Sequence, residues 1–241
     1  MITTYWKAFG ASVRGPGHAR KFIANQDSFR IVHHFWGDVV VVSDGVGSHP
    51  TSEYGSSAAC RAVIESSKVW SEMNSDTNKL VELIHKNWLS LVKPFDPNSS
   101  SATCLFAIRP AEGAFVLGML GDGLIGVIKT DDEYLEFCDD KNDMFSNQTN
   151  ALSEITSVDL WQTALIPQED CSAIVLCTDG VADDLHPEKR EEFVRHIYRQ
   201  GEKNGVITSS RDVRIMLESW PVPKHSDDKT LVCYFRIREK P

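Results

Sequence analysis

The chain has 241 residues, 41% of them hydrophobic and 24% charged, and its formal net charge is −9. This composition is typical of a globular protein, and the length suits one large domain. The acidic excess argues against a nucleic-acid partner, because a nucleic-acid-binding face needs basic residues to neutralise phosphates. No apolar run reaches the roughly 18 residues of a membrane span, and the N-terminus shows no signal-peptide pattern. We therefore expect no nucleic-acid and no membrane partner.

The six cysteines sit mostly in apolar runs, and none of them forms a C-x-x-C pair. They are Cys60, Cys104, Cys138, Cys171, Cys177 and Cys233. Buried thiols that act as small hydrophobic residues are the simplest interpretation. Such thiols are typical of a reducing compartment, so we predict a cytoplasmic location.

The first half of the chain predicts three strands followed by two helices. Strands are expected over 6–13, 27–34 and 38–43, and the last is a continuous apolar run typical of a fully buried strand. Two glycines after Asp44 permit a tight turn. A helix is then expected from Thr51 or Ser52 to about Glu72, and a second over 77–92, where apolar residues recur at helical spacing.

The second half is dominated by strands. They are expected over 102–108, 113–120, 124–129, 134–138, 172–177 and 230–237, with helices over 187–200 and 213–220. Between them, 139–163 loses any regular pattern and is predicted to be a flap-like loop. With no linker or repeat, we expect 1–241 to be a single domain. Its element order suits an α+β fold in which helices pack outside a β-sandwich.

Carboxylates recur where hydrophobic strands end. Asp44, Asp122 and Asp179 each precede a glycine at the end of an apolar run, Asp227 lies just before the last strand, and Asp27 opens an early one. Converging carboxylates repel each other unless a cation lies between them, and hard divalent cations prefer oxygen ligands. A single Asp-Gly pair is usually only a turn, so spacing alone leaves both a metal site and a set of turns open.

The same residues lie in an ordered series of short motifs. The series comprises Asn25-Gln26-Asp27-Ser28, Val42-Ser43-Asp44-Gly45-Val46-Gly47, Ser101-Ala102-Thr103, Gly121-Asp122-Gly123, Thr178-Asp179-Gly180-Val181-Ala182-Asp183 and Asp227-Asp228-Lys229-Thr230. In order and extent it resembles the motif series of the protein phosphatase 2C family, metal-dependent Ser/Thr phosphatases, and a short bacterial-type catalytic domain in particular. The resemblance implies a central antiparallel β-sandwich with helices on both sides, in four α-β-β-α layers.

The resemblance also implies a role for each matching residue. Asp44 would bridge two Mg²⁺ or Mn²⁺ ions, and the Gly45 carbonyl would join one of them. Asp179 and Asp227 would complete the shell of the first ion, and these three aspartates form the predicted catalytic set. Asp122 would help to hold a third, looser ion shared with Asp179. A hydroxide between two metal ions would then attack phosphorus in line.

The chain departs from the family pattern around its first motif. Gln26 stands where many members have Glu, which weakens one acidic contact to the second ion, while Asp27 would sit behind the metal pair and orient water. For phosphate binding we favour Arg20, because a guanidinium can grip phosphate at two points. A solvated surface arginine is the alternative for this residue.

The function implied by the resemblance is hydrolysis of phosphoserine or phosphothreonine in a phosphorylated protein, opposing a Ser/Thr kinase. Two alternatives stay open. The fold could serve as a catalytically weak or inactive regulatory or binding protein, which Gln26 favours. The site could also hydrolyse small phosphoesters, because a metal centre recognises the phosphate rather than its carrier.

Overall fold

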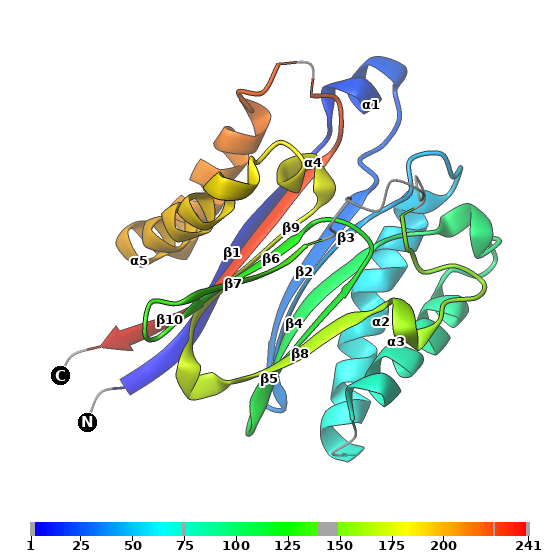
Figure 1. Ribbon diagram of the computed structural model, residues 1–241. Helices are drawn as coiled ribbons and strands as arrows, with labels where there is room; N and C mark the ends of the chain where they lie inside the picture. Colours follow the sequence, from blue (N-terminus) through cyan, green and yellow to red (C-terminus); the bar gives the residue numbers. More distant parts are fainter. Residues whose placement is uncertain (1–2, 74–75, 139–148, 224, 240–241) are drawn as a thin grey trace.

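The computed structural model describes residues 3–73, 76–138, 149–223 and 225–239. Within these residues, ten strands form two five-stranded sheets that stack face to face, with helices on both outer sides (Figure 1). All strand pairs are antiparallel. The arrangement confirms the α+β sandwich of four layers.

The first sheet joins the two ends of the chain. Its strand order is β1-β10-β9-β6-β7. The bounds are β1 Thr3–Val13, β6 Leu124–Lys129, β7 Tyr134–Cys138, β9 Cys171–Cys177 and β10 Lys229–Glu239. β1 and β10 pair along their whole length, from Thr3 opposite Glu239 to Val13 opposite Lys229.

The second sheet is built from the middle of the chain. Its strand order is β2-β3-β4-β5-β8. The bounds are β2 Asp27–His34, β3 Gly37–Asp44, β4 Cys104–Pro110, β5 Ala114–Leu120 and β8 Gln162–Pro167. The valine run of β3 is fully buried because it lies between the opposing sheet and the helices, as a continuous apolar strand requires.

Helices cover the outer faces of both sheets. α2 and α3 pack on the second sheet and α5 packs on the first (Figure 1). The bounds are α1 Pro16–Lys21, α2 Ser52–Met73, α3 Thr77–Leu91, α4 Asp179–Ala182 and α5 Pro187–Glu218, with 3₁₀ turns η1 Asn98–Ser100, η2 Val158–Leu160 and η3 Gln168–Asp170. The short helices α1 and α4 lie together at one end of the sandwich (Figure 1).

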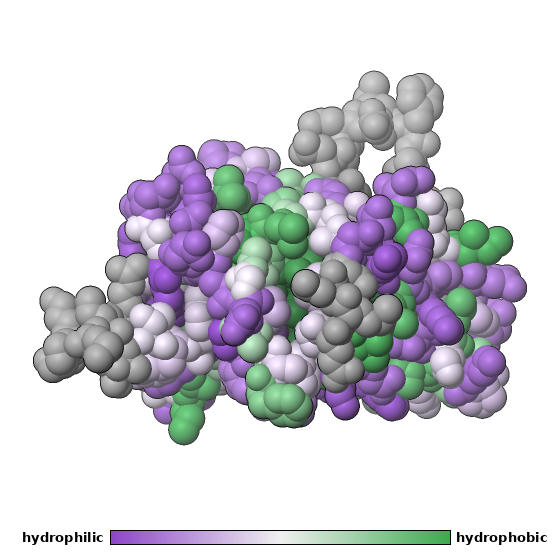
Figure 2. Space-filling model, turned by 90° about the horizontal axis from the view of Figure 1, so that it is seen from below, coloured by the Kyte–Doolittle hydropathy of each residue, from purple (hydrophilic) through white to green (hydrophobic). Residues whose placement is uncertain are grey.

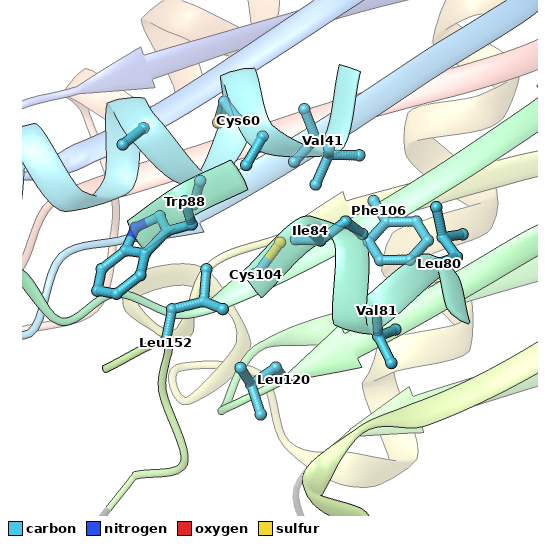
Figure 3. Close-up of a cluster of buried hydrophobic side chains, with 14 of the residues drawn as sticks. Val41, Cys60, Leu80, Val81, Ile84, Trp88, Cys104, Phe106, Leu120 and Leu152 are labelled. Atoms are coloured by element: carbon cyan, nitrogen blue, oxygen red, sulfur yellow. The ribbon is translucent and has the colours of Figure 1, made fainter. Parts of the chain in front are cut away.

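Three apolar layers hold the fold together. One lies between the sheets, one beneath α5, and one between the second sheet and the α2–α3 pair. In the last layer, Trp88 and Ile84 of α3 face Phe106 and Cys104 of β4 (Figure 3). All six cysteines lie in the described residues and form no disulfide, and all but Cys138 are buried.

The outer faces of the helical layers are largely hydrophilic. Seen from the end opposite α1 and α4, apolar residues emerge between two hydrophilic flanks (Figure 2). This pattern follows from helices that bury one stripe and expose the other. In the described parts of the chain, every helix falls short of the length or apolarity that a membrane crossing requires.

The structure corrects several details of the sequence prediction. The helix expected to begin at residue 213 starts just after Gly205, which has a left-handed φ of 73° and separates two helical halves of α5. The polar residues of this stretch hid its helical pattern. β8, α1 and α4 were not predicted. Of the expected flap over 139–163, residues 139–148 lie outside the described residues, and the regular strand β8 already begins at Gln162.

Candidate metal centre

The first carboxylate pair comes from neighbouring strands. Asp27 opens β2, Asp44 closes β3, and the two residues are direct partners in the antiparallel register. The two carboxyl groups act on each other electrostatically. Burial, reinforced by the charges of Asp27 and Asp179, raises the pKa of Asp44 well above its ordinary value. Burial also raises the pKa of Asp27, to about 6. The pair therefore resists carrying two negative charges unless a cation compensates.

The third carboxylate, that of Asp179, lies just beyond the end of β9 in the opposing sheet. β9 ends at Cys177, Thr178 caps α4, and Asp179 is the first residue of that helix. Burial, together with repulsion from Asp122, Asp227 and Asp27, raises the pKa of Asp179 to about 8. The carboxylates of both sheets thus meet at the end of the sandwich that carries α4.

Asp122 and Asp227 flank this group from two sides. Asp122 sits in the turn between β5 and β6, where Gly121 and Gly123 have left-handed φ angles of 94° and 124°. Its Oδ2 accepts a hydrogen bond from Thr149 at 3.0 Å. Asp227 is exposed and lines a cavity of about 200 Å³ together with Asp179. Asp179 is coupled electrostatically to both residues and to Asp44, so the four predicted metal-binding aspartates lie near one another.

Gly45 and Gln26 hold the backbone behind Asp44. The Gly45 N–H donates to the Gln26 carbonyl at 3.1 Å, and a Cβ on Gly45 would lie 2.5 Å from the Ser52 carbonyl oxygen. Only glycine fits this close approach. The Gln26 side chain is 5% exposed, and its Oε1 is buried without a hydrogen-bond partner. Gln26 therefore offers an unused neutral oxygen beside Gly47, in the turn that follows Asp44.

Asp228 is an anchoring residue that sequence reasoning did not identify. Its carboxylate accepts hydrogen bonds from the backbone N–H groups of Gly15 and Gln26, both at 2.6 Å, and contacts His18 Nδ1 at 2.9 Å. It is 1% exposed. Asp228 thus ties the segment that carries α1 to the start of β10 and fixes Gln26 and Asp27. The Asp-Asp pair at 227–228, together with Gly15 and His18, is the sequence pattern that could have indicated this anchoring role.

Lys229 was also missed, and it is the basic residue inside this acidic group. Its ammonium donates to His225 Nδ1 at 2.9 Å and to the Asp227 carbonyl at 3.2 Å. Burial lowers the pKa of Lys229, against the opposing pull of Asp184, Asp227, Asp27 and Asp179. Burial and the Lys229 charge likewise lower the pKa of His225, consistent with a neutral imidazole that accepts the hydrogen bond.

Arg20, the predicted phosphate-binding residue, lies in the last turn of α1 and is exposed. Within the described residues it makes no hydrogen bond or ion pair with the carboxylate group.

A second cavity, of about 530 Å³, opens between the loop after Asp44 and the segment that leads into η2. It is lined by Val46, Ser48, His49, Ser101, Thr149, Asn150, Ala151, Ser153, Ile155 and Leu160.

The donor set suits a hard divalent cation. Asp27 Oδ1, Asp179 Oδ1 and Gln26 Oε1 are buried and lack a hydrogen-bond partner, and oxygens of this kind are the ligands that Mg²⁺ and Mn²⁺ prefer. In the ranges that the structure describes, no three His, Cys, Asp or Glu side chains are already arranged to hold a metal ion.

The chain is similar to known proteins in sequence and in fold. Residues 14–218 match the sequence profile of the family described as Protein phosphatase 2C. No curated protein sequence matches the chain.

Many solved structures share the fold, and three of them show the extent of the similarity to the chain. The photosystem II phosphatase PBCP superposes with a TM-score of 0.67 at 15% identity, over 96% of this chain and 98% of its own. RsbX in complex with magnesium superposes with a TM-score of 0.62 at 15% identity, over 98% of this chain and 100% of its own. The catalytic domain of the serine threonine protein phosphatase PstP, in complex with two manganese ions, superposes with a TM-score of 0.60 at 18% identity. The superposition covers 98% of this chain and 100% of that domain.

Proposed function

The chain belongs to the protein phosphatase 2C family, and on that premise we propose that it removes phosphate from phosphoserine and phosphothreonine in a phosphorylated protein. The proposal includes two or three Mg²⁺ or Mn²⁺ ions at the carboxylate group. Asp44, the Gly45 carbonyl, Asp179 and Asp227 would hold the catalytic pair. Asp122 would hold a further ion together with Asp179.

One observation carries the proposal. Five aspartates from segments far apart in the sequence couple electrostatically at one end of the sandwich, and burial raises the pKa of three of them, Asp27, Asp44 and Asp179. Clustered buried carboxylates cost folding free energy, which a structural role alone does not repay. A bound divalent cation would offset the repulsion between these carboxylates, and the carboxylates would then serve as its ligands.

The residues of the chain divide the work of such a reaction. Bound divalent ions lower the pKa of water and neutralise charge on a phosphoryl group. Asp44 would position the ions from the second sheet, and Asp179 and Asp227 from the first. Asp27 is held by Thr178 Oγ1, which donates to its Oδ2 at 2.8 Å, and can orient water behind Asp44. The cysteines are not needed as nucleophiles, and burial raises the pKa of five of them, including Cys60 to about 12.

Two further points of the proposal concern context. The match over residues 14–218 and the nearly complete overlap with the solved structures support one catalytic domain that spans the chain. Buried thiols without disulfides support a reducing, cytoplasmic setting, in which the enzyme would oppose a Ser/Thr kinase.

A panel of phosphopeptides tests the proposal. Phosphoserine and phosphothreonine peptides, p-nitrophenyl phosphate and nucleotides are incubated with the protein in Mn²⁺, Mg²⁺ or EDTA, and released phosphate is measured. We expect release from the peptides with either metal and none in EDTA. Turnover of nucleotides but not of peptides would assign a small-molecule phosphoesterase instead. Calorimetric Mn²⁺ binding without turnover of any substrate would assign a binding protein.

A further inference from the structure

The cavity beside Asp179 is lined by a positively charged side chain of the protein itself, that of Lys229. The cavity is lined by Asp179, Gly180, Asp183, Asp184, His225, Ser226, Asp227 and Lys229. The Lys229 side chain is among the largest fully buried ones in the described chain, with 1% exposure. A lysine buried this deeply is rare unless its charge is compensated.

Among the described residues, several carboxylates together compensate the charge of Lys229, and none of them is its dedicated ion-pair partner. Asp184, Asp227, Asp27 and Asp179 all act electrostatically on its ammonium. Asp184 is itself oriented by the Trp220 indole N–H, which donates to Asp184 Oδ2 at 2.7 Å. The ammonium is held in place by His225 Nδ1 and the Asp227 carbonyl oxygen. These contacts fix one positive charge on the side of the site formed by α4 and the start of β10.

We propose that Lys229 is a built-in counter-ion of the metal centre, which holds the Asp179–Asp227 side together and weakens the binding of a further divalent cation in that cavity. This inference rests on the proposed function, because it concerns the same site. A fixed ammonium repels a divalent ion electrostatically, and in a partly buried site this repulsion is screened only weakly. It also donates to the loop that carries Asp227, so the loop stays in place without metal. The ligand that Lys229 opposes is a hard divalent cation.

Three substitutions separate charge from packing. Lys229→Met removes the charge and keeps most of the apolar stem. Lys229→Gln also removes the charge but can still donate to His225 and to the Asp227 carbonyl. Lys229→Arg keeps the charge. Lys189→Met is the matched control, since it removes one positive charge from an exposed surface pair with Glu192.

The first experiment is Mn²⁺ titration calorimetry at fixed ionic strength, with wild type and all four variants. We expect Lys229→Met and Lys229→Gln to bind an additional Mn²⁺ ion, or to bind the weakest ion on the order of 10-fold or more tightly. Lys229→Arg and Lys189→Met should match wild type. Isotherms of Lys229→Met and Lys229→Gln that coincide with wild type would overturn the inference.

The second experiment needs no metal. A double-mutant cycle with Lys229→Met and Asp184→Asn is measured by thermal unfolding in EDTA. We expect the two shifts in melting temperature to be non-additive, with the lysine substitution more harmful when Asp184 is present. Additive shifts would also overturn the inference.

The two proposals can fail separately. Wild type that neither binds Mn²⁺ nor turns over phosphopeptides refutes the proposed function, yet the counter-ion assignment then still requires Lys229→Met to gain Mn²⁺ binding. Wild type that binds Mn²⁺ and is active, beside variants with unchanged isotherms, refutes only the counter-ion assignment.

Discussion

Asp27 and Asp44 face each other as the first residue of β2 and the last residue of β3, and burial raises the pKa of both carboxyl groups. The antiparallel register makes this unavoidable, because it places the start of one strand opposite the end of the next. In the absence of a cation, protonation of one of the two groups relieves the repulsion between them. The pair therefore links metal binding, protonation and stability.

The stability of the metal-free protein should fall as pH rises. Burial raises the pKa of Asp27 to about 6 and of Asp179 to about 8 in the folded chain, against 3.8 when unfolded. The folded state then binds more protons than the unfolded state between about pH 4 and pH 8, so stability is full below this window and is lost across it. In EDTA we expect the melting temperature to drop by at least about 5 °C between pH 5 and pH 8.

Excess Mn²⁺ should reverse this trend, because metal ligands must be deprotonated and binding becomes stronger as pH rises. Asp44→Asn in EDTA is the control, and its curve should be flatter since the repulsion is relieved. A wild-type melting temperature in EDTA that rises from pH 5 to pH 8 would contradict the assignment of these carboxyl groups.

Asp44→Asn should abolish nearly all phosphatase activity. The substitution replaces the central anionic ligand by a neutral amide, and loss of a direct ligand costs more than the roughly 10- to 100-fold typical of residues behind the ligands. Phosphate release from a phosphopeptide in saturating Mn²⁺ measures the effect. Asp131→Asn, in the exposed β6–β7 hairpin, makes the same chemical change far from the cluster and should keep full activity. Retained activity in Asp44→Asn would remove this residue from the mechanism.

The fold was predictable to the extent that its periodic patterns are local. The valine run of β3 and the apolar spacing of α3 each identify an element without outside information. β8 could not be found in this way, because its residues are half exposed and Leu165 is 61% exposed at the surface. α1 is too short for a helical period and is held by its backbone contact with Ser226.

The sequence indicated which carboxylates gather at the candidate site, but it did not indicate the residues that hold them in place. Aspartates at strand ends, together with glycines that permit turns, indicated where carboxylates converge. Asp228 and Lys229 differ from them because their roles depend on long-range partners, such as Gly15 and Asp184, that no local pattern reveals. Arg20 lies on an exposed helical turn, and its role in phosphate binding stays a prediction.

Gln26→Glu should strengthen binding of one divalent ion. Its Oε1 is buried, lacks a hydrogen-bond partner and lies close to the Gly45–Gly47 turn. A carboxylate there adds an anionic oxygen ligand when metal is present and an uncompensated charge when it is absent. We expect tighter Mn²⁺ binding by about 10-fold in calorimetry, with a lower melting temperature in EDTA. Gln162→Glu, on the exposed start of β8, should change neither. Unchanged Mn²⁺ affinity in Gln26→Glu would place this side chain outside the metal centre.

Asp38→Asn should destabilise the fold without affecting metal binding. Asp38 is the second residue of β3, at the far end of the strand from Asp44. It accepts hydrogen bonds from Tyr234, from His33 at 2.9 Å and from Arg109 at 2.9 Å. Burial alone would raise the pKa of Asp38, but the hydrogen bonds from Tyr234, Arg109 and His33 outweigh it and lower the pKa below 3.8.

This network joins the two sheets, since Tyr234 belongs to β10 and the other three residues to β2, β3 and β4. An amide cannot accept from all three donors, so we expect a loss of about 2 kcal/mol in the free energy of unfolding at pH 7.

The lowered pKa means that the contribution of Asp38 is present above about pH 4 and disappears as pH falls further, so the variant and wild type should converge in acid. Denaturant unfolding at pH 7 and pH 3 measures both effects. Mn²⁺ affinity should stay at the wild-type value, and a change there would mean that the two ends of the sandwich are coupled through β3.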